Sequence, residues 1–114
     1  MAEKQEYKII ITAFAERAYF EVLSYVFDYY SFERANEIAF ELLQCPQILK
    51  EFPLLGKVEP NLAQRHQEYR FLLFERTKRT TVKIIYYVDE QTQTIYLTDF
   101  FPCEMSEGRI GKRN

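Results

Sequence analysis

The chain has 114 residues, of which 47% are hydrophobic and 28% charged, and its formal net charge is −2. This length and composition describe one ordered domain and exclude an intrinsically disordered protein. No apolar run approaches the roughly 20 residues that cross a bilayer. Residues 1–6 lack the basic and then apolar pattern of a secretory signal, so we expect a cytoplasmic protein without membrane contact.

The first third of the chain predicts a strand followed by a long helix. Residues 7–12 form a short run rich in branched side chains, which is typical of a strand. Thr12 suits the N-cap of the helix that follows. Its apolar positions recur at spacings of three and four, which predicts a buried stripe made of Phe14, Ala18, Val22, Tyr25 and Tyr29.

A second helix is expected to begin after Ser31, which is a good N-cap, and to end or kink at residues 44–46, which include a proline. Its apolar stripe is predicted to comprise Ala35, Ile38, Ala39, Leu42 and Leu43. The two helices then form a hairpin with almost no loop. Residues 52–56 contain Pro53 and Gly56 and predict a turn.

The second half of the chain alternates between apolar and polar residues and predicts three strands. The first begins at Tyr69, and residues 81–88 and 95–101 form an antiparallel pair joined by the polar turn at residues 89–93. The order is β-α-α-β-β-β, which predicts an α+β fold with a helical hairpin packed on a mainly antiparallel sheet. We expect residues 1–114 to form a single domain, with a loose tail from about residue 106.

Residues 65–83 carry six basic and two acidic side chains, which makes a local basic patch on an acidic molecule. Such a patch could bind a nucleic acid or an acidic partner, or it could serve only solubility and edge protection. The candidates for binding are Arg65, Arg76, Lys78, Arg79 and Lys83.

Two residues of this region are candidates for catalysis. His66 is the only side chain whose ordinary pKa lies near neutrality, so it is the natural general base, although a lone loop histidine is also a common surface residue. Arg70 could clamp a phosphate with its guanidinium or could instead pair with Glu68 or Glu75. Tyrosines at 86, 87 and 96 could stack on bases or pack in the sheet.

No motif for a cofactor or a metal is present. Cys45 and Cys103 are isolated, and the single histidine leaves no set of ligands with zinc spacing. In a cytosolic protein, both cysteines are expected to be half-buried thiols. The chain also lacks a Ser/His/Asp set, a phosphate-binding glycine loop and clustered carboxylates.

The order of elements resembles that of the RelE/ParE toxins of bacterial type II toxin–antitoxin systems. Three further features carry the resemblance, namely the Pro-x-x-Gly turn at residues 53–56, Arg70 in the next strand, and the Lys-Ile-Ile-Tyr-Tyr-Val-Asp strand at residues 83–89. The resemblance covers residues 7 to 108. It implies a toxin that a cognate antitoxin protein holds inactive.

The resemblance implies one of two targets. RelE-like members cleave mRNA on the ribosome with basic residues, whereas ParE-like members inhibit DNA gyrase. In many relatives an Arg-Gln pair lies where this chain has Glu104 and Met105, and a carboxylate repels phosphate. We therefore expect action by protein binding, of the ParE type. The alternatives are an mRNA endoribonuclease that uses Arg70, His66 and the basic loop, and an interaction module without toxicity, so enzymatic activity is open.

Overall fold

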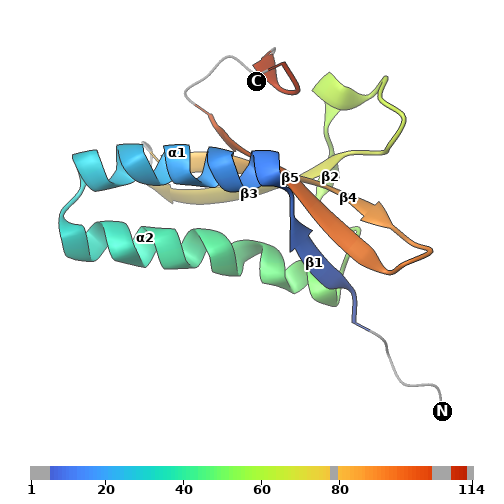
Figure 1. The fold of residues 1–114 in the computed structure, drawn as a ribbon, viewed down its shortest axis with the longest axis horizontal. Coiled ribbons are helices and arrows are strands. Elements are labelled where there is room, and N and C mark those ends of the chain that lie inside the picture. The colour runs from blue at the N-terminus through green and yellow to red at the C-terminus, as the bar shows by residue number, and fades with distance from the viewer. Residues whose placement is uncertain (1–5, 78–79, 104–108, 113–114) are drawn as a thin grey trace.

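The computed structural model describes residues 6–77, 80–103 and 109–112. Its helices and strands are arranged as Figure 1 shows, and the symbol η denotes a 3-10 helix in the text. They are β1 (Lys8–Ile11), α1 (Ala13–Tyr29), α2 (Phe32–Gln44), η1 (Cys45–Lys50), β2 (Lys57–Val58), η2 (Pro60–Leu62), β3 (Arg70–Thr77), β4 (Thr80–Asp89) and β5 (Thr94–Pro102).

The strands form one five-stranded sheet in the order β1-β5-β4-β3-β2. The pairs among β2, β3, β4 and β5 are antiparallel, whereas β1 lies parallel to β5. The expected α+β fold is confirmed, but the sheet is mixed and has a short additional strand, β2. A parallel neighbour of β5 requires a long crossover connection, which the helical hairpin and the intervening strands supply.

The two helices lie side by side on one face of the sheet (Figure 1). Both predicted N-caps are present. The Thr12 hydroxyl accepts a hydrogen bond from the Ala15 N–H at 3.2 Å, and the Ser31 hydroxyl accepts one from the Arg34 N–H at 3.2 Å. The α-helix ends at Gln44, before Pro46, as predicted, and the chain continues as η1. Among the described residues, no helix is long and apolar enough to cross a membrane.

The buried face of α1 differs from the predicted stripe. Ala18 and Val22 are buried, but Tyr25 and Tyr29 are exposed and stack on each other with ring centroids 5.8 Å apart. The core instead receives Ala15, Ala18, Tyr19, Val22 and Val26. Aromatic residues occur almost all around this helix, so its periodicity does not single out one face. Small side chains at the start of the helix allow close packing on the sheet.

The face of the sheet opposite the helices has a small core of its own. Leu62, Ile85, Phe101 and Ile110 are buried together there. Residues 104–108 and 113–114 of the expected loose tail lie outside the described residues. Within that tail, however, Ile110 is only 2% exposed. Ile110 therefore packs on the sheet with Ile85 and Phe101.

Candidate functional site

The candidate site lies on the sheet face opposite the helices. Alternation along β4 places Val82, Ile84 and Tyr86 in the core beneath the helices. Residues 83, 85 and 87 consequently point to the other face. This face receives η2, the loop at residues 63–69 and the turn at residues 110–111. Of the predicted site residues, Arg65, His66 and Lys83 lie on it, whereas Arg70 pairs in register with Tyr86 and so lies on the helix side of β3.

Lys83 lies in this face but is buried, and it pairs with a carboxylate. Its Nζ donates a hydrogen bond to Oε1 of Glu59 at 2.9 Å, and Glu59 is itself fully buried. The same ammonium lies 4.2 Å from the centroid of the Phe71 ring. Lys83 therefore links the segment before η2 to the sheet.

The Glu59 carboxylate has further donors besides Lys83. Its Oε2 accepts hydrogen bonds from the backbone N–H and the side-chain amide of Asn61, at 2.9 and 3.0 Å. Burial by itself raises the pKa of Glu59, but the hydrogen bonds from Asn61 and Lys83 outweigh burial and hold the pKa below its ordinary value. Glu59 is therefore held as an anion that matches the buried ammonium.

Arg70 holds the Pro-x-x-Gly turn. Its guanidinium donates to the Gly56 carbonyl at 2.8 Å and to a Glu68 carboxylate oxygen at 2.7 Å. The N–H of Gly56 donates to the Tyr86 hydroxyl at 2.9 Å. Burial raises the pKa of Tyr86, and the Gly56 hydrogen bond and the Arg70 charge offset part of that effect. Both polar groups of Gly56 are thus bound by side chains of the sheet.

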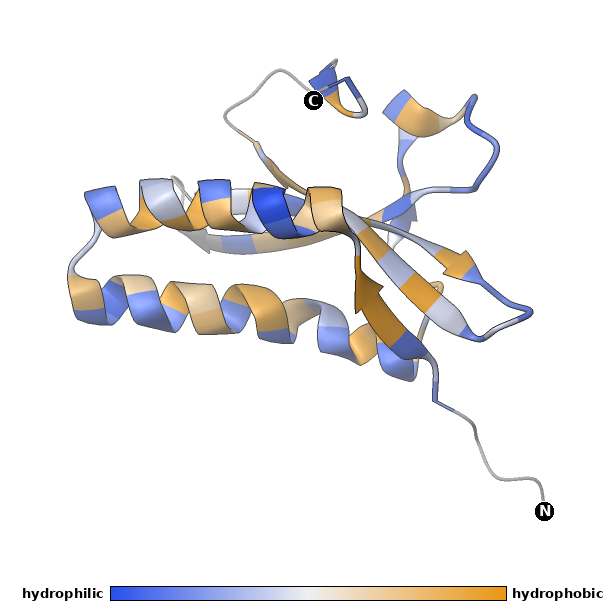
Figure 2. Cartoon of the chain, in the orientation of Figure 1, coloured by the Kyte–Doolittle hydropathy of each residue, from blue (hydrophilic) through white to orange (hydrophobic). Residues whose placement is uncertain are grey.

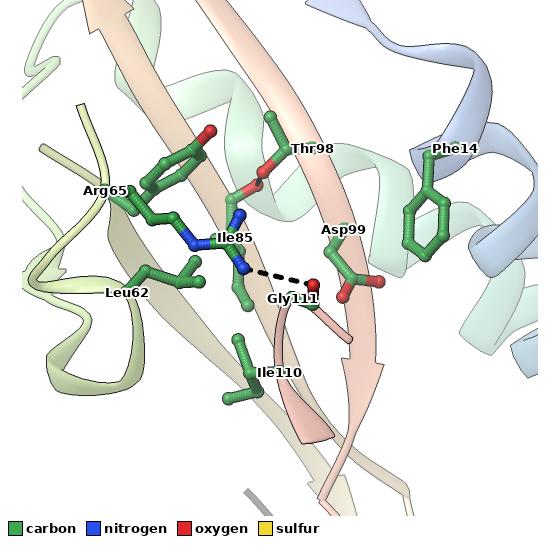
Figure 3. A pocket seen from close by; sticks show the side chains of 9 residues that line it. Phe14, Leu62, Arg65, Ile85, Thr98, Asp99, Ile110 and Gly111 are labelled. Carbon is green, nitrogen blue, oxygen red and sulfur yellow. Dashed lines mark hydrogen bonds between the residues drawn. The ribbon is translucent and has the colours of Figure 1, made fainter. Parts of the chain in front are cut away.

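Arg65 lies at the rim of an open pocket on this face (Figure 3). Its guanidinium donates to the Gly111 carbonyl at 3.2 Å. Leu62 and Ile110 form apolar walls of the pocket, and Asp99 lies on the side of β5. The pocket is therefore bridged by a contact between the 63–69 loop and the turn at 110–111.

His66 lines a neighbouring pocket together with Glu59, Glu68 and Tyr69. Arg70 does not belong to that lining: it pairs in register with Tyr86 on the helix side of β3, where its guanidinium bonds to Gly56 and Glu68. The two predicted catalytic side chains are therefore not joined by a contact. Lys78, Arg79, Glu104 and Met105 lie outside the described residues, as does the side chain of Arg76.

Three tyrosines form a row across the same face. The Tyr69 and Tyr87 rings meet edge to face with centroids 5.6 Å apart, and Tyr87 stacks on Tyr96 at 5.1 Å. All three are partly exposed, whereas Tyr86 is buried. Burial, the neighbouring tyrosines and Asp89 raise the pKa of Tyr87. The sequence indicates residues 87 and 96 as candidates for stacking, and alternation places Tyr69 on one face with Phe71, but it does not predict that the Tyr69 ring meets Tyr87.

The fold and the site define a small α+β protein whose site face combines a row of tyrosines with a buried lysine that is paired with the Glu59 carboxylate. No group of three or more His, Cys, Asp and Glu side chains within the described ranges is placed to hold a metal. No family model matches the sequence, and none of the curated proteins compared with it is similar to it.

Proposed function

We propose that this chain is the toxin-side component of a type II toxin–antitoxin system and that it acts by binding a protein target, as ParE-like toxins do. The element order, the turn at residues 53–56 and the strand at residues 83–89 support the family. The resemblance makes a cognate antitoxin the expected partner and DNA gyrase the expected target, in the cytoplasm.

The observation that carries the choice of protein binding is the state of two of the predicted basic residues. Lys83 is buried against Glu59, and Arg70 is bonded to Glu68 and to the turn. An RNA-cleaving site needs positive charge directed at phosphate, where it stabilises the charge that develops in the transition state. Here carboxylates of the chain itself already neutralise these two cations.

The second candidate is a ribosome-dependent mRNA endonuclease, and the row of Tyr69, Tyr87 and Tyr96 favours it. Rings about 5 to 6 Å apart on an open sheet face offer a surface on which unpaired bases could stack. His66 and Arg65 lie beside Tyr69 in the adjoining pockets. In this reading they would supply the general base and a phosphate contact.

Induced expression in a bacterial host separates these functions. Growth, new 5′ ends in cellular mRNA and plasmid supercoiling are measured in the same cultures, for the wild type and for His66→Ala and Tyr87→Ala variants. Protein binding predicts arrest with altered supercoiling, intact mRNA and no effect of His66→Ala. New cleavage sites that disappear in either variant would establish the endonuclease. Soluble wild-type protein without arrest would identify an interaction module that is not toxic.

A further inference from the structure

The outer surface of the helical hairpin exposes an aromatic seam, which we define as Phe20 and Phe27 of α1 with Phe32 and Phe40 of α2. Their exposed fractions are 58%, 36%, 73% and 65%. Figure 2 shows hydrophobic segments on both helices of the hairpin. Phenylalanines exposed to this extent are not needed for the core, which suggests that a partner covers them.

The antiparallel register of the helices arranges the seam as two pairs. The Phe27 and Phe32 rings lie 5.8 Å apart. The Tyr19 hydroxyl donates to the Ala39 carbonyl at 2.9 Å, which places the next residues, Phe20 and Phe40, at one level of the hairpin. Phe27 follows Phe20 by seven positions, so the pairs are about 10 Å apart along the helix. This spacing matches two turns of a helix laid along the seam.

The charges of the hairpin select the kind of partner. Residues 13–44 contain six acidic and two basic side chains, a net charge of −4. Arg34, one of the two bases, already pairs with Glu37 at 3.5 Å. Glu16 lies four residues before Phe20, and Glu33 lies seven before Phe40, so by helix geometry each shares a row with a seam phenylalanine. Both carboxylates are exposed.

This charge disfavours three possible occupants. An anionic membrane surface and a nucleic acid are repelled by the acidic rim. A second copy of the same seam would bring like charges together. An amphipathic helix with an apolar stripe and Lys or Arg on both flanks fits the phenylalanines and the carboxylates at once.

From this geometry, we infer that the seam is a docking site for an amphipathic protein helix with basic flanks. The inference does not depend on the proposed toxin function, because it uses only the surface of the hairpin. If the toxin proposal holds, the antitoxin is expected to contain an amphipathic helix with basic flanks that covers α1 and α2.

The test measures direct binding by the purified chain. The probe is a fluorescent helical peptide of about 18 residues with Leu at positions i, i+3, i+4 and i+7 and Lys on its flanks, matched by a peptide with Glu in place of Lys. The chain is expected to bind the Lys peptide in the micromolar range and to bind the Glu peptide at least about tenfold more weakly. A Phe32→Ala/Phe40→Ala variant is expected to lose about tenfold or more in affinity.

Phe52→Ala is the matched control, because Phe52 is 50% exposed and lies outside the hairpin. Circular dichroism establishes that each variant is folded. Equal binding of both peptides, no binding of either, or an equal loss in Phe52→Ala would overturn the inference. Light scattering that shows a dimer of the wild type but not of the seam variant would also overturn the inference, since it would identify a second copy as the occupant. Binding to anionic phosphatidylserine vesicles that depends on the seam would overturn it as well, since it would identify a membrane.

Discussion

Replacing Lys83 with Met is expected to destabilise the chain strongly, because it leaves the fully buried Glu59 carboxylate without its counter-ion. Removing one partner of a buried pair costs about 3 to 5 kcal/mol in the free energy of unfolding. Glu59 keeps both hydrogen bonds from Asn61, so the low end, about 3 kcal/mol, applies. For a chain of this length, that corresponds to a fall in Tm of roughly 10 °C.

The pH dependence of the loss in unfolding free energy caused by Lys83→Met provides an independent check. In the wild type the pKa of Glu59 is held below its ordinary value of 4.5, so the carboxylate contributes stability above that pH and loses it as the pH falls through the folded-state pKa. Removing Lys83 raises the pKa of Glu59 relative to the wild type. The difference in unfolding free energy between wild type and Lys83→Met should therefore be largest near neutrality and should narrow as the pH falls below 4.5.

Urea unfolding followed by circular dichroism measures both effects, and a Glu59→Met/Lys83→Met double variant is the control. Removing both charges is expected to restore much of the stability, because a buried pair is often replaced by apolar groups at little cost. The reasoning is refuted if Lys83→Met loses less than about 1 kcal/mol near neutral pH. A double variant as unstable as Lys83→Met would refute it as well, because the loss would then not come from an unpaired charge.

Three further changes test the turn and the helix cap. Tyr86→Phe leaves the buried Gly56 N–H without its acceptor and should lower the free energy of unfolding in urea by about 1 to 3 kcal/mol. Unchanged stability would show that this hydrogen bond is dispensable. Gly56→Ala places a Cβ 2.6 Å from the Phe71 carbonyl oxygen, so we expect circular dichroism to show an unfolded or strongly destabilised protein. Native-like thermal melting of this variant would contradict the expectation. Ser31→Ala removes the cap of α2 and should lower Tm by an amount equivalent to about 1 kcal/mol, whereas Ser31→Asp should retain it.

The local parts of the fold could be predicted from the sequence. Thr12 and Ser31 are caps that act within three residues, and the pairing of β4 with β5 follows from two alternating segments joined by a polar turn. The buried face of α1 could not be predicted in full, because its aromatic residues occur on several sides. The parallel pairing of β1 with β5 joins segments about 85 residues apart, for which no local pattern exists.

For the candidate site, residue type indicated which side chains carry charge but not how that charge is used. The sequence offers Glu68 and Glu75 as partners for Arg70, and the structure shows the pair with Glu68. Lys83 was expected at a binding surface, whereas it is buried against Glu59, a residue that lies in a segment without periodicity. A buried ion pair of this kind depends on tertiary packing. Alternation along β4 predicts the face to which Lys83 points, but it does not predict the carboxylate that Lys83 meets there.

The parallel pairing of β1 with β5 also constrains when the chain can fold during synthesis. β1 is the first strand to be made, yet its only neighbour in the described sheet is the last. Until β5 has left the ribosome, the three isoleucines of β1 lack the strand beside which they lie in the native sheet. Such nonlocal closure slows folding and leaves an apolar segment accessible to chaperones or to other nascent chains. The helical hairpin, by contrast, can form as soon as its own residues have emerged.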